Sequence, residues 1–303
     1  MFSTKNGAAR LSLIIVTVLI TLKVVVAIIT GSISILAQAA DSFLDLFAVI
    51  ITFLAIGVAT KPADEEHPFG HGKVENIAAV VQAVLIFSAG GLIIYSAVRR
   101  IILGTTVELT EAGIGVMLVS LVVSLWLSRH LLKVSKATDS VALEANARNI
   151  AADVYSAAGV LVGLVAIRFT GLNILDPIIA MAVALLILKV GYDIMKKSFG
   201  GLMDVRLPKA EEAEIMSCIN EHGGQLVGFH ALRTRKAGSW RYMDLHLVMP
   251  KNASVEEAHR ICDHLEQDIE NRLQYTSVII HVEPCDEECD QCAVSCSLRK
   301  AKP

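Results

Sequence analysis

Four oxygen-bearing side chains occupy matching positions in two apolar segments of the chain. Asp41 and Asp45 are four residues apart, and so are Asn149 and Asp153. Residues four apart share one face of a helix, so each pair should present its oxygens together. A carboxylate inside a bilayer costs about 2.5–3.5 kcal/mol. We therefore expect the four side chains to surround a divalent cation, whose charge offsets that cost.

Other interpretations of these four residues do not require a metal. The side chains could hydrogen-bond between helices or line a watery crevice. Lys23 and Lys189, which also lie in apolar segments, could pair with the acids. The repeated spacing favours the metal site over these alternatives.

A second group of candidate ligands lies in the polar stretch 60–76, TKPADEEHPFGHGKVEN. Asp64, His67 and His71 stand close together there, and carboxylate and imidazole suit zinc and related divalent ions. Pro68 and Gly70 predict a turn between the two histidines. A solvated loop without a metal is the alternative.

A third group lies near the C-terminus, on segments predicted to be strands. Side chains alternate along a strand, so His246 shares a face with its neighbours two residues away, and His281 shares a face with Glu283. His230 lies on the preceding predicted strand. Each histidine alone would be an ordinary surface residue, whereas the four residues together favour metal binding.

Six cysteines fall into two classes. Four end the chain in the pattern C-x3-C-x2-C-x3-C, at Cys285, Cys289, Cys292 and Cys296. They could hold zinc or an iron–sulfur cluster, or they could be incidental thiols of a disordered tail. Cys218 and Cys262 lie on apolar helix stripes and are predicted to be core residues. A cytoplasmic location argues against structural disulfides.

The apolar segments that carry the first group of ligands are predicted to be membrane helices. The 303 residues are 54% hydrophobic with a mean hydropathy of +0.57, which excludes a single water-soluble domain. A bilayer core needs about 20 apolar residues per helix. Six such runs occur, at about 12–30, 33–59, 77–101, 112–132, 145–168 and 174–196.

The basic residues of the connecting segments predict the orientation of these helices. Basic residues concentrate on the cytoplasmic side of a membrane, and nine of them flank the runs on one side against three on the other. This places both termini in the cytoplasm. The nine are Lys5, Arg10, Lys61, Lys73, Arg129, Lys133, Lys136, Lys196 and Lys197, and the three are Arg99, Arg100 and Arg168.

The remainder of the chain is predicted to be a small soluble domain. Residues 1–200 carry 15 basic and 13 acidic side chains, and residues 201–303 carry 12 and 17. Neither part has the basic face of a nucleic-acid binder. Apolar spacing predicts the order αββαβ over residues 205–284, with strands at 226–234, 240–249 and 277–283, and a helix that Ser254 caps. This order implies an α+β layer with helices on one face of a sheet.

Together these segments resemble the cation diffusion facilitator family. The resemblance covers about residues 10–284 and rests on GSISILAQAADSFLDL, HPFGHGKVE, NIAADVYSAAGVLVG, GFHALRTRKAG, DLHLVMP, EEAH and IIHVEP. It implies a homodimer, in which each chain has a six-helix transport domain (1–204) and a cytoplasmic, metallochaperone-like (ferredoxin-like) domain (205–284). The tail, 285–303, lies outside the resemblance.

The resemblance also implies an activity, namely export of divalent metal from the cytoplasm in exchange for protons. Metal ions would be both substrate and regulator, with no organic cofactor, and a bacterial inner membrane is the expected location. A non-transporting partner of another transporter and a membrane metal sensor are the alternatives. An enzyme is not expected, because no phosphate-binding loop or nucleophile–base pair is found in the sequence.

The family's functional residues carry over onto matching positions of this chain. Asp41, Asp45 and Asp153 match the transport-site acids. Asp64, His67 and His71 match the loop site, and His230, His246, His281 and Glu283 match the cytoplasmic site. His259 matches a further ligand contributed by the partner subunit, and Lys73 with Asp204 resembles a charge pair that stabilises the dimer.

Asn149 departs from the family pattern. Zinc-transporting members usually have histidine at this position, and some members for other metals have aspartate. An amide leaves the transport site with oxygen ligands alone, which suit Mn²⁺ or Fe²⁺ better than Zn²⁺. The sequence therefore favours iron or manganese over zinc as the substrate.

Overall fold

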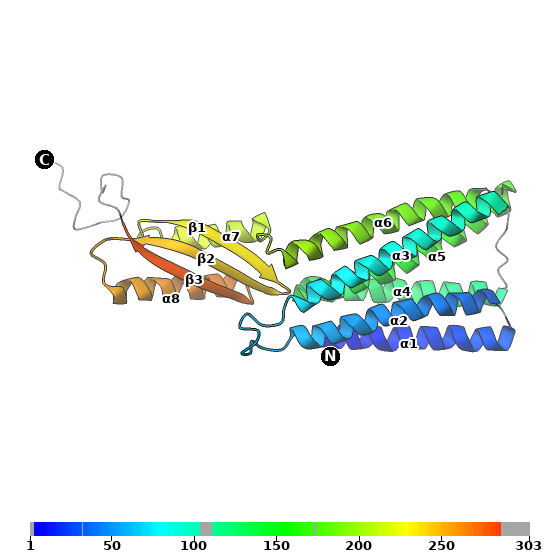
Figure 1. Cartoon of the computed structure of the whole chain (residues 1–303), viewed down its shortest axis with the longest axis horizontal. Coiled ribbons are helices and arrows are strands. Elements are labelled where there is room, and N and C mark those ends of the chain that lie inside the picture. Colours follow the sequence, from blue (N-terminus) through cyan, green and yellow to red (C-terminus); the bar gives the residue numbers. More distant parts are fainter. Residues whose placement is uncertain (1–2, 32, 104–110, 173, 286–303) are drawn as a thin grey trace. The chain divides into compact units, whose positions relative to one another are not determined.

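The structure, a computed structural model, describes residues 3–31, 33–103, 111–172 and 174–285. The chain divides into two compact units, Met1–Leu202 and Met203–Pro303. Figure 1 shows that the first is built of long helices and that the second combines a sheet with two helices.

Within the described residues, the first unit has six helices that are long and apolar enough to cross a membrane. This confirms the predicted membrane bundle, since each apolar run coincides with one helix, to within one residue at the start of the sixth run. The first helix begins seven residues earlier than predicted, because the Thr4 hydroxyl accepts a hydrogen bond from the Gly7 N–H and caps it. The helices are α1 (Lys5–Thr30), α2 (Ile33–Ala59), α3 (Val74–Leu103), α4 (Glu111–Thr138), α5 (Val141–Thr170) and α6 (Leu175–Leu202).

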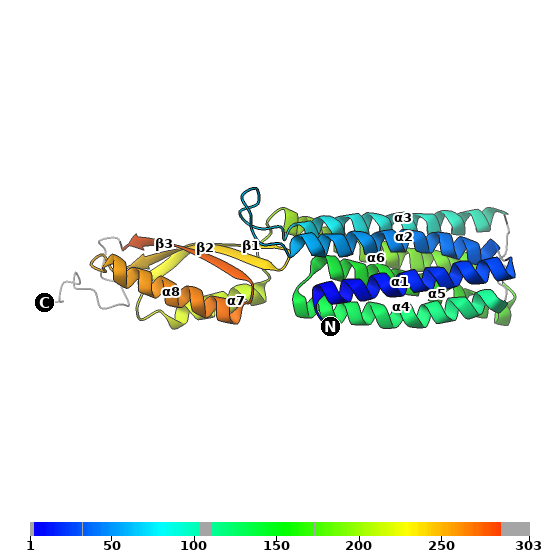
Figure 2. The same ribbon diagram turned by 90° about the horizontal axis from the view of Figure 1, so that it is seen from below.

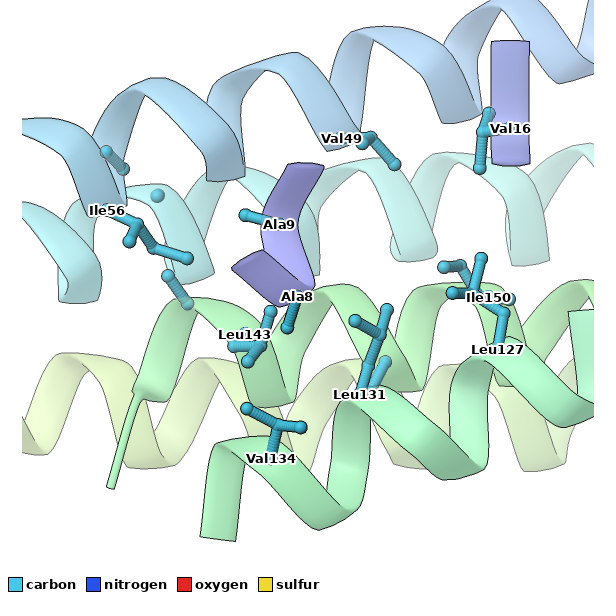
Figure 3. Close-up of a cluster of buried hydrophobic side chains, with 14 of the residues drawn as sticks. Ala8, Ala9, Val16, Val49, Ile56, Leu127, Leu131, Val134, Leu143 and Ile150 are labelled. Carbon is cyan, nitrogen blue, oxygen red and sulfur yellow. The ribbon is translucent and has the colours of Figure 1, made fainter. Parts of the chain in front are cut away.

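Small and branched side chains form the core of the bundle. Buried residues of α1, α2, α4 and α5 meet in one cluster, in which Ala8, Leu131 and Leu143 are fully buried (Figure 3). Helix α3 packs mainly on α6. A Cβ atom added at Gly191 of α6 would lie 3.0 Å from Ile86 Cγ2 of α3, so glycine permits this close approach.

Polar contacts join the helix ends that flank the loop between α2 and α3. Glu75, which is only 1% exposed, accepts from Lys5 Nζ at 3.0 Å and from Ser140 Oγ at 2.6 Å. Asn76 Nδ2 donates to the Ser198 carbonyl at 3.2 Å. These bonds tie α1, α3, α5 and α6 together beside the predicted loop site.

The second unit is an α+β layer, as predicted. Its sheet has the order β1-β2-β3, with β1 antiparallel and β3 parallel to β2. Figure 2 shows α7 and α8 on one side of this sheet. The elements are α7 (Lys209–Glu221), β1 (Gly228–Ala237), β2 (Trp240–Met249), α8 (Val255–Arg272) and β3 (Thr276–Pro284).

The strand β1 ends three residues later than predicted. Lys236 and Ala237, which lie between the two predicted strands, belong to β1 and pair with Arg241 and Trp240. The turn falls at Gly238, whose φ of +62° requires a conformation that glycine adopts readily. The predicted cap of α8 is confirmed, since Ser254 Oγ accepts from the Glu257 N–H.

The two faces of the sheet have different roles. Met243, Leu245 and Leu247 of β2 are buried and pack with the apolar stripes of α7 and α8. The alternate residues of β2, among them His246, point to the opposite face and are only partly buried. This open face carries the third predicted group of ligands.

Candidate metal sites

The β-sheet brings the three C-terminal histidines into one row. His230 pairs with His246 across β1 and β2, and His246 pairs with His281 across β2 and β3. The ring centroids are 5.1 Å apart in the first pair and 4.9 Å apart in the second. The predicted grouping of these residues on one sheet face therefore matches the strand register.

Glu283 lies beside this row and contacts all three histidines. Its Oε1 is 2.8 Å from His246 Nδ1, its Oε2 is 3.3 Å from His230 Nε2, and its Oε1 is 3.6 Å from His281 Nε2. Ligand atoms of His230, His246 and Glu283 all lie within 4.8 Å of one another. Two imidazoles and a carboxylate, with a third imidazole beside them, form a donor set suited to zinc-like divalent ions. We call these four residues the sheet-face site.

His259 is not brought to the sheet-face site within one chain. It lies on α8, which packs on the other face of the sheet, and its Nδ1 is 3.5 Å from Asp263 Oδ1. Its role as a ligand from a partner subunit remains a prediction.

The loop residues Asp64, His67 and His71 also come together, with ligand atoms within 4.8 Å of one another. Asp64 Oδ1 accepts from the His67 backbone N–H at 2.7 Å and lies 3.2 Å from His67 Nδ1. His71 Nε2 lies 3.4 Å from Asp64 Oδ2. The turn predicted between the histidines, with φ of +74° at Gly70, allows both rings to face the same carboxylate.

The environment of Asp64 keeps its carboxylate ionised. The hydrogen bond from the His67 backbone N–H lowers the pKa of Asp64 below its ordinary value, and the neighbouring histidine rings lower it further. An ionised carboxylate needs to lose no proton before it binds a cation. The loop therefore offers one anionic and two imidazole ligands, although its metal occupancy remains a prediction.

The four oxygen-bearing membrane residues lie on two helices that pack against each other, α2 and α5. On α5, Asn149 is buried and Asp153 is exposed, and on α2 Asp45 is half-buried. The side chain of Asp41 lies outside the described part of the structure. The helix pairing is compatible with the predicted transport site, whose metal coordination remains a prediction.

The structure places the two membrane lysines differently from each other. Lys23 of α1 donates to Ser42 Oγ at 2.6 Å, and Ser42 follows Asp41 directly on α2. Lys189 is exposed on α6. A lysine ammonium therefore lies beside the α2 segment that carries both acids, and its pairing with either acid remains an alternative interpretation.

Two further predictions extend beyond single units or beyond the described residues. Lys73 Nζ lies 3.4 Å from the Leu202 carbonyl in the first unit, and Asp204 Oδ1 lies 3.3 Å from Arg235 Nη1 in the second. The pairing of Lys73 with Asp204 would join the two units and remains a prediction. In the tail, Cys285 is buried, while Cys289, Cys292 and Cys296 lie outside the described residues.

Among the described residues, one group of ligands was not among the predicted sites. Cys218 and Cys262 are buried in the core, as expected. Cys218 also lies beside His222 and Asp268, and their ligand atoms fall within 4.8 Å of one another. The spacing Cys-x3-His at the C-terminal end of α7 was a usable signal, but Asp268 comes from α8 and only helix packing brings it there.

Comparison with known proteins covers both units. Residues 9–203 match the cation efflux transmembrane domain, and residues 207–285 match the cytoplasmic domain of cation efflux proteins. An uncharacterized transporter, sll1263 of Synechocystis, is 33% identical over 280 residues, which cover 91% of this chain and 90% of the relative. The cation-efflux pump FieF of Salmonella paratyphi A is 32% identical over 284 residues, 92% of this chain and 93% of the relative.

The solved zinc form of CzrB is 38% identical over 27% of this chain and 92% of its own, with a TM-score of 0.26. The family matches extend over most of both units, and the relatives align with nearly the full length of the chain. The protein therefore belongs to the cation diffusion facilitator family of membrane cation efflux transporters, as the resemblance of its motifs predicted.

Proposed function

We propose that this transporter moves divalent metal ions out of the cytoplasm in exchange for protons, by alternating access. The observation that carries the proposal is the repeated four-residue spacing of Asp41 with Asp45 on α2 and of Asn149 with Asp153 on α5, two helices in contact. Metal binds from the cytoplasm while the carboxylates are ionised. After the site opens outward, protons compete for the same oxygens and release the ion.

Asn149 supports Fe²⁺ or Mn²⁺ as the preferred substrate. Its buried amide offers an oxygen ligand that does not take up a proton. Proton exchange then depends on Asp41, Asp45 and Asp153 alone. A site of oxygen ligands suits these harder ions better than zinc.

The second unit fits a regulatory role in a homodimer. Two observations support cytoplasmic termini in a bacterial inner membrane. They are the match of this unit to a cytoplasmic domain of cation efflux proteins, and the nine basic residues that flank the membrane helices on one side against three on the other. Metal bound at the sheet-face site, with His259 from the partner subunit, would draw the two C-terminal units together. This would favour the state that transports, with Lys73 and Asp204 stabilising the dimer near the membrane.

The test compares two aspartate substitutions in membrane helices. Asp45→Ala should abolish metal uptake by reconstituted vesicles, whereas Asp193→Ala on α6 should retain it, because Asp193 lies outside the proposed site. Both variants should elute from size-exclusion chromatography as the wild-type protein does. Uptake retained by Asp45→Ala would contradict the proposed transport site, and absence of uptake in the wild-type protein would favour a regulatory partner.

A further inference from the structure

A group of three different ligand types lies between α7 and α8, away from the sheet-face site. Cys218 and His222 are four residues apart, so both side chains lie on the same side of the chain where α7 ends. Asp268 faces them from α8, with its Oδ2 3.3 Å from His222 Nε2. The group thus joins two helices on the face of the sheet opposite to Glu283.

The His222 ring has the hydrogen bonding of a metal ligand. Its Nδ1 lies 3.0 Å from the Cys218 carbonyl oxygen, so an Nδ1–H that donates to this oxygen assigns the proton to Nδ1. Nε2 is then left with a free lone pair directed towards Asp268. Histidines that bind metals usually donate their other ring N–H in this way, which fixes the ring and its tautomer.

Burial is graded across the group from the thiol outward. Cys218 is fully buried, the His222 side chain is 13% exposed, and the Asp268 side chain is 49% exposed. The thiol therefore lies at the base of the group and the carboxylate at its mouth, where a cation could enter from solvent. The ligands of a tetrahedral zinc ion are about 3.3–3.8 Å apart, so atoms within 4.8 Å of one another need only small side-chain shifts.

The positive charge of the nearby Arg272 guanidinium does not prevent a cation from binding here. Arg272 of α8 lies near Cys218, but its guanidinium is paired with Glu221 at 2.9 Å and lies 3.7 Å from Glu214. These two carboxylates offset its charge. Burial raises the pKa of the Cys218 thiol, so a metal ion would have to displace the thiol proton when it binds. The resulting thiolate and the Asp268 carboxylate would then match the charge of a divalent ion.

We propose that Cys218, His222 and Asp268 form a site for a divalent cation with affinity for sulfur, such as Zn²⁺, that links α7 to α8. Water would complete a tetrahedral coordination. The inference does not depend on the transport mechanism, because the ligands lie in the C-terminal unit and none of them belongs to the other three groups. Bound metal would stabilise this unit by holding its two helices together.

Cobalt is the probe for this site, because Co²⁺ bound to a thiolate gives a near-ultraviolet charge-transfer band that histidine and carboxylate ligands do not give. The starting protein is the full chain in detergent, with Cys285, Cys289, Cys292 and Cys296 replaced by serine. Two buried thiols then remain, at Cys218 and Cys262. We expect the band in this protein and in its Cys262→Ala variant, and its loss in Cys218→Ala.

Two substitutions nearer the surface keep the test valid if Cys218→Ala does not fold. Asp268→Asn and His222→Gln should weaken Co²⁺ binding, followed by the band, about tenfold or more, since loss of even an outer partner of a metal site costs 10–100-fold. Zn²⁺ should displace the cobalt and slow alkylation of Cys218, as read by mass spectrometry. Absence of the band, or a band that Asp268→Asn and His222→Gln leave unchanged, would overturn the proposal.

Discussion

The sheet-face site and the acidic residues of α2 and α5 differ in the free-energy cost of having no metal bound. The His230 and His281 side chains are 53% and 65% exposed, and Glu283 already has imidazole partners. Water and these contacts satisfy the ligands without a metal. The acids of α2 and α5 lie in helices of high hydropathy, where an ionised carboxylate is costly.

This difference in cost suits two different roles for the two sites. A site that is stable when empty can fill and empty as the cytoplasmic metal concentration changes, which suits regulation. A membrane site whose empty, ionised form is unfavourable must hold either a cation or protons, which suits exchange. The proposed function assigns regulation to the sheet and exchange to the helices.

Neutralising a membrane carboxylate should have the largest effect on transport, and it tests whether the membrane acids carry out the exchange. Asp153→Asn keeps the size of the side chain but removes its charge and its ability to exchange a proton. We expect metal transport to fall at least about 100-fold, since a direct ligand should exceed the 10–100-fold effect of an outer partner. Vesicle uptake measures this, and transport at half the wild-type rate would show that Asp153 is not a ligand.

Replacing the amide at position 149 should change selectivity rather than abolish transport. Asn149→His introduces an imidazole, which zinc accepts more readily than Mn²⁺ or Fe²⁺ do. We expect the ratio of zinc to iron or manganese uptake to rise about tenfold, which corresponds to roughly 1.4 kcal/mol. Competition between the ions in vesicles checks this, and an unchanged ratio would remove Asn149 as a determinant of selectivity.

A change at the sheet-face site should affect transport less. His246→Ala removes the central imidazole of the row and should lower metal affinity of this site about 10–100-fold, with only a few-fold loss of uptake at limiting metal. His264→Ala, an exposed histidine of α8, is the matched control. Isothermal titration on the full chain measures the affinity, and complete loss of uptake in His246→Ala would contradict a purely regulatory role.

Glu75→Gln should have the smallest effect on transport. Glu75 is buried and bonded to Lys5 and Ser140, so we assign it to structure rather than to metal exchange. Loss of the ion pair should lower the free energy of unfolding by about 1–3 kcal/mol. Thermal unfolding in detergent checks this. If uptake per folded molecule also fell strongly, Glu75 would have to be placed on the ion path.

Local patterns in the sequence predicted much of this molecule. Apolar runs located the six helices, and strand alternation placed His281 and Glu283 on one face, because both patterns follow from the period of one element. The sheet register adds His230 and His246 to this group. The ends of helices and strands were predicted less accurately. The Thr4 cap extends α1, and the pairing of Lys236 extends β1, beyond their apolar residues.

Features that depend on packing between elements could not be read from one segment. The contact of Lys23 with Ser42 joins α1 to α2, and the position of Asp268 beside His222 joins α8 to α7. Neither contact can be predicted from the residue spacing within one helix. Such contacts follow only when the buried faces of both helices are known.

Metal uptake into vesicles with an imposed pH gradient tests the central claim most directly. Wild-type protein would be given Fe²⁺, Mn²⁺, Zn²⁺, Co²⁺ and Cd²⁺ in turn, with an acidic vesicle interior and with the gradient collapsed. We predict uptake of Fe²⁺ or Mn²⁺ above Zn²⁺, accelerated by the gradient and accompanied by proton release from the vesicles. Uptake that does not respond to the gradient, or no uptake of any ion, would contradict exchange of metal for protons.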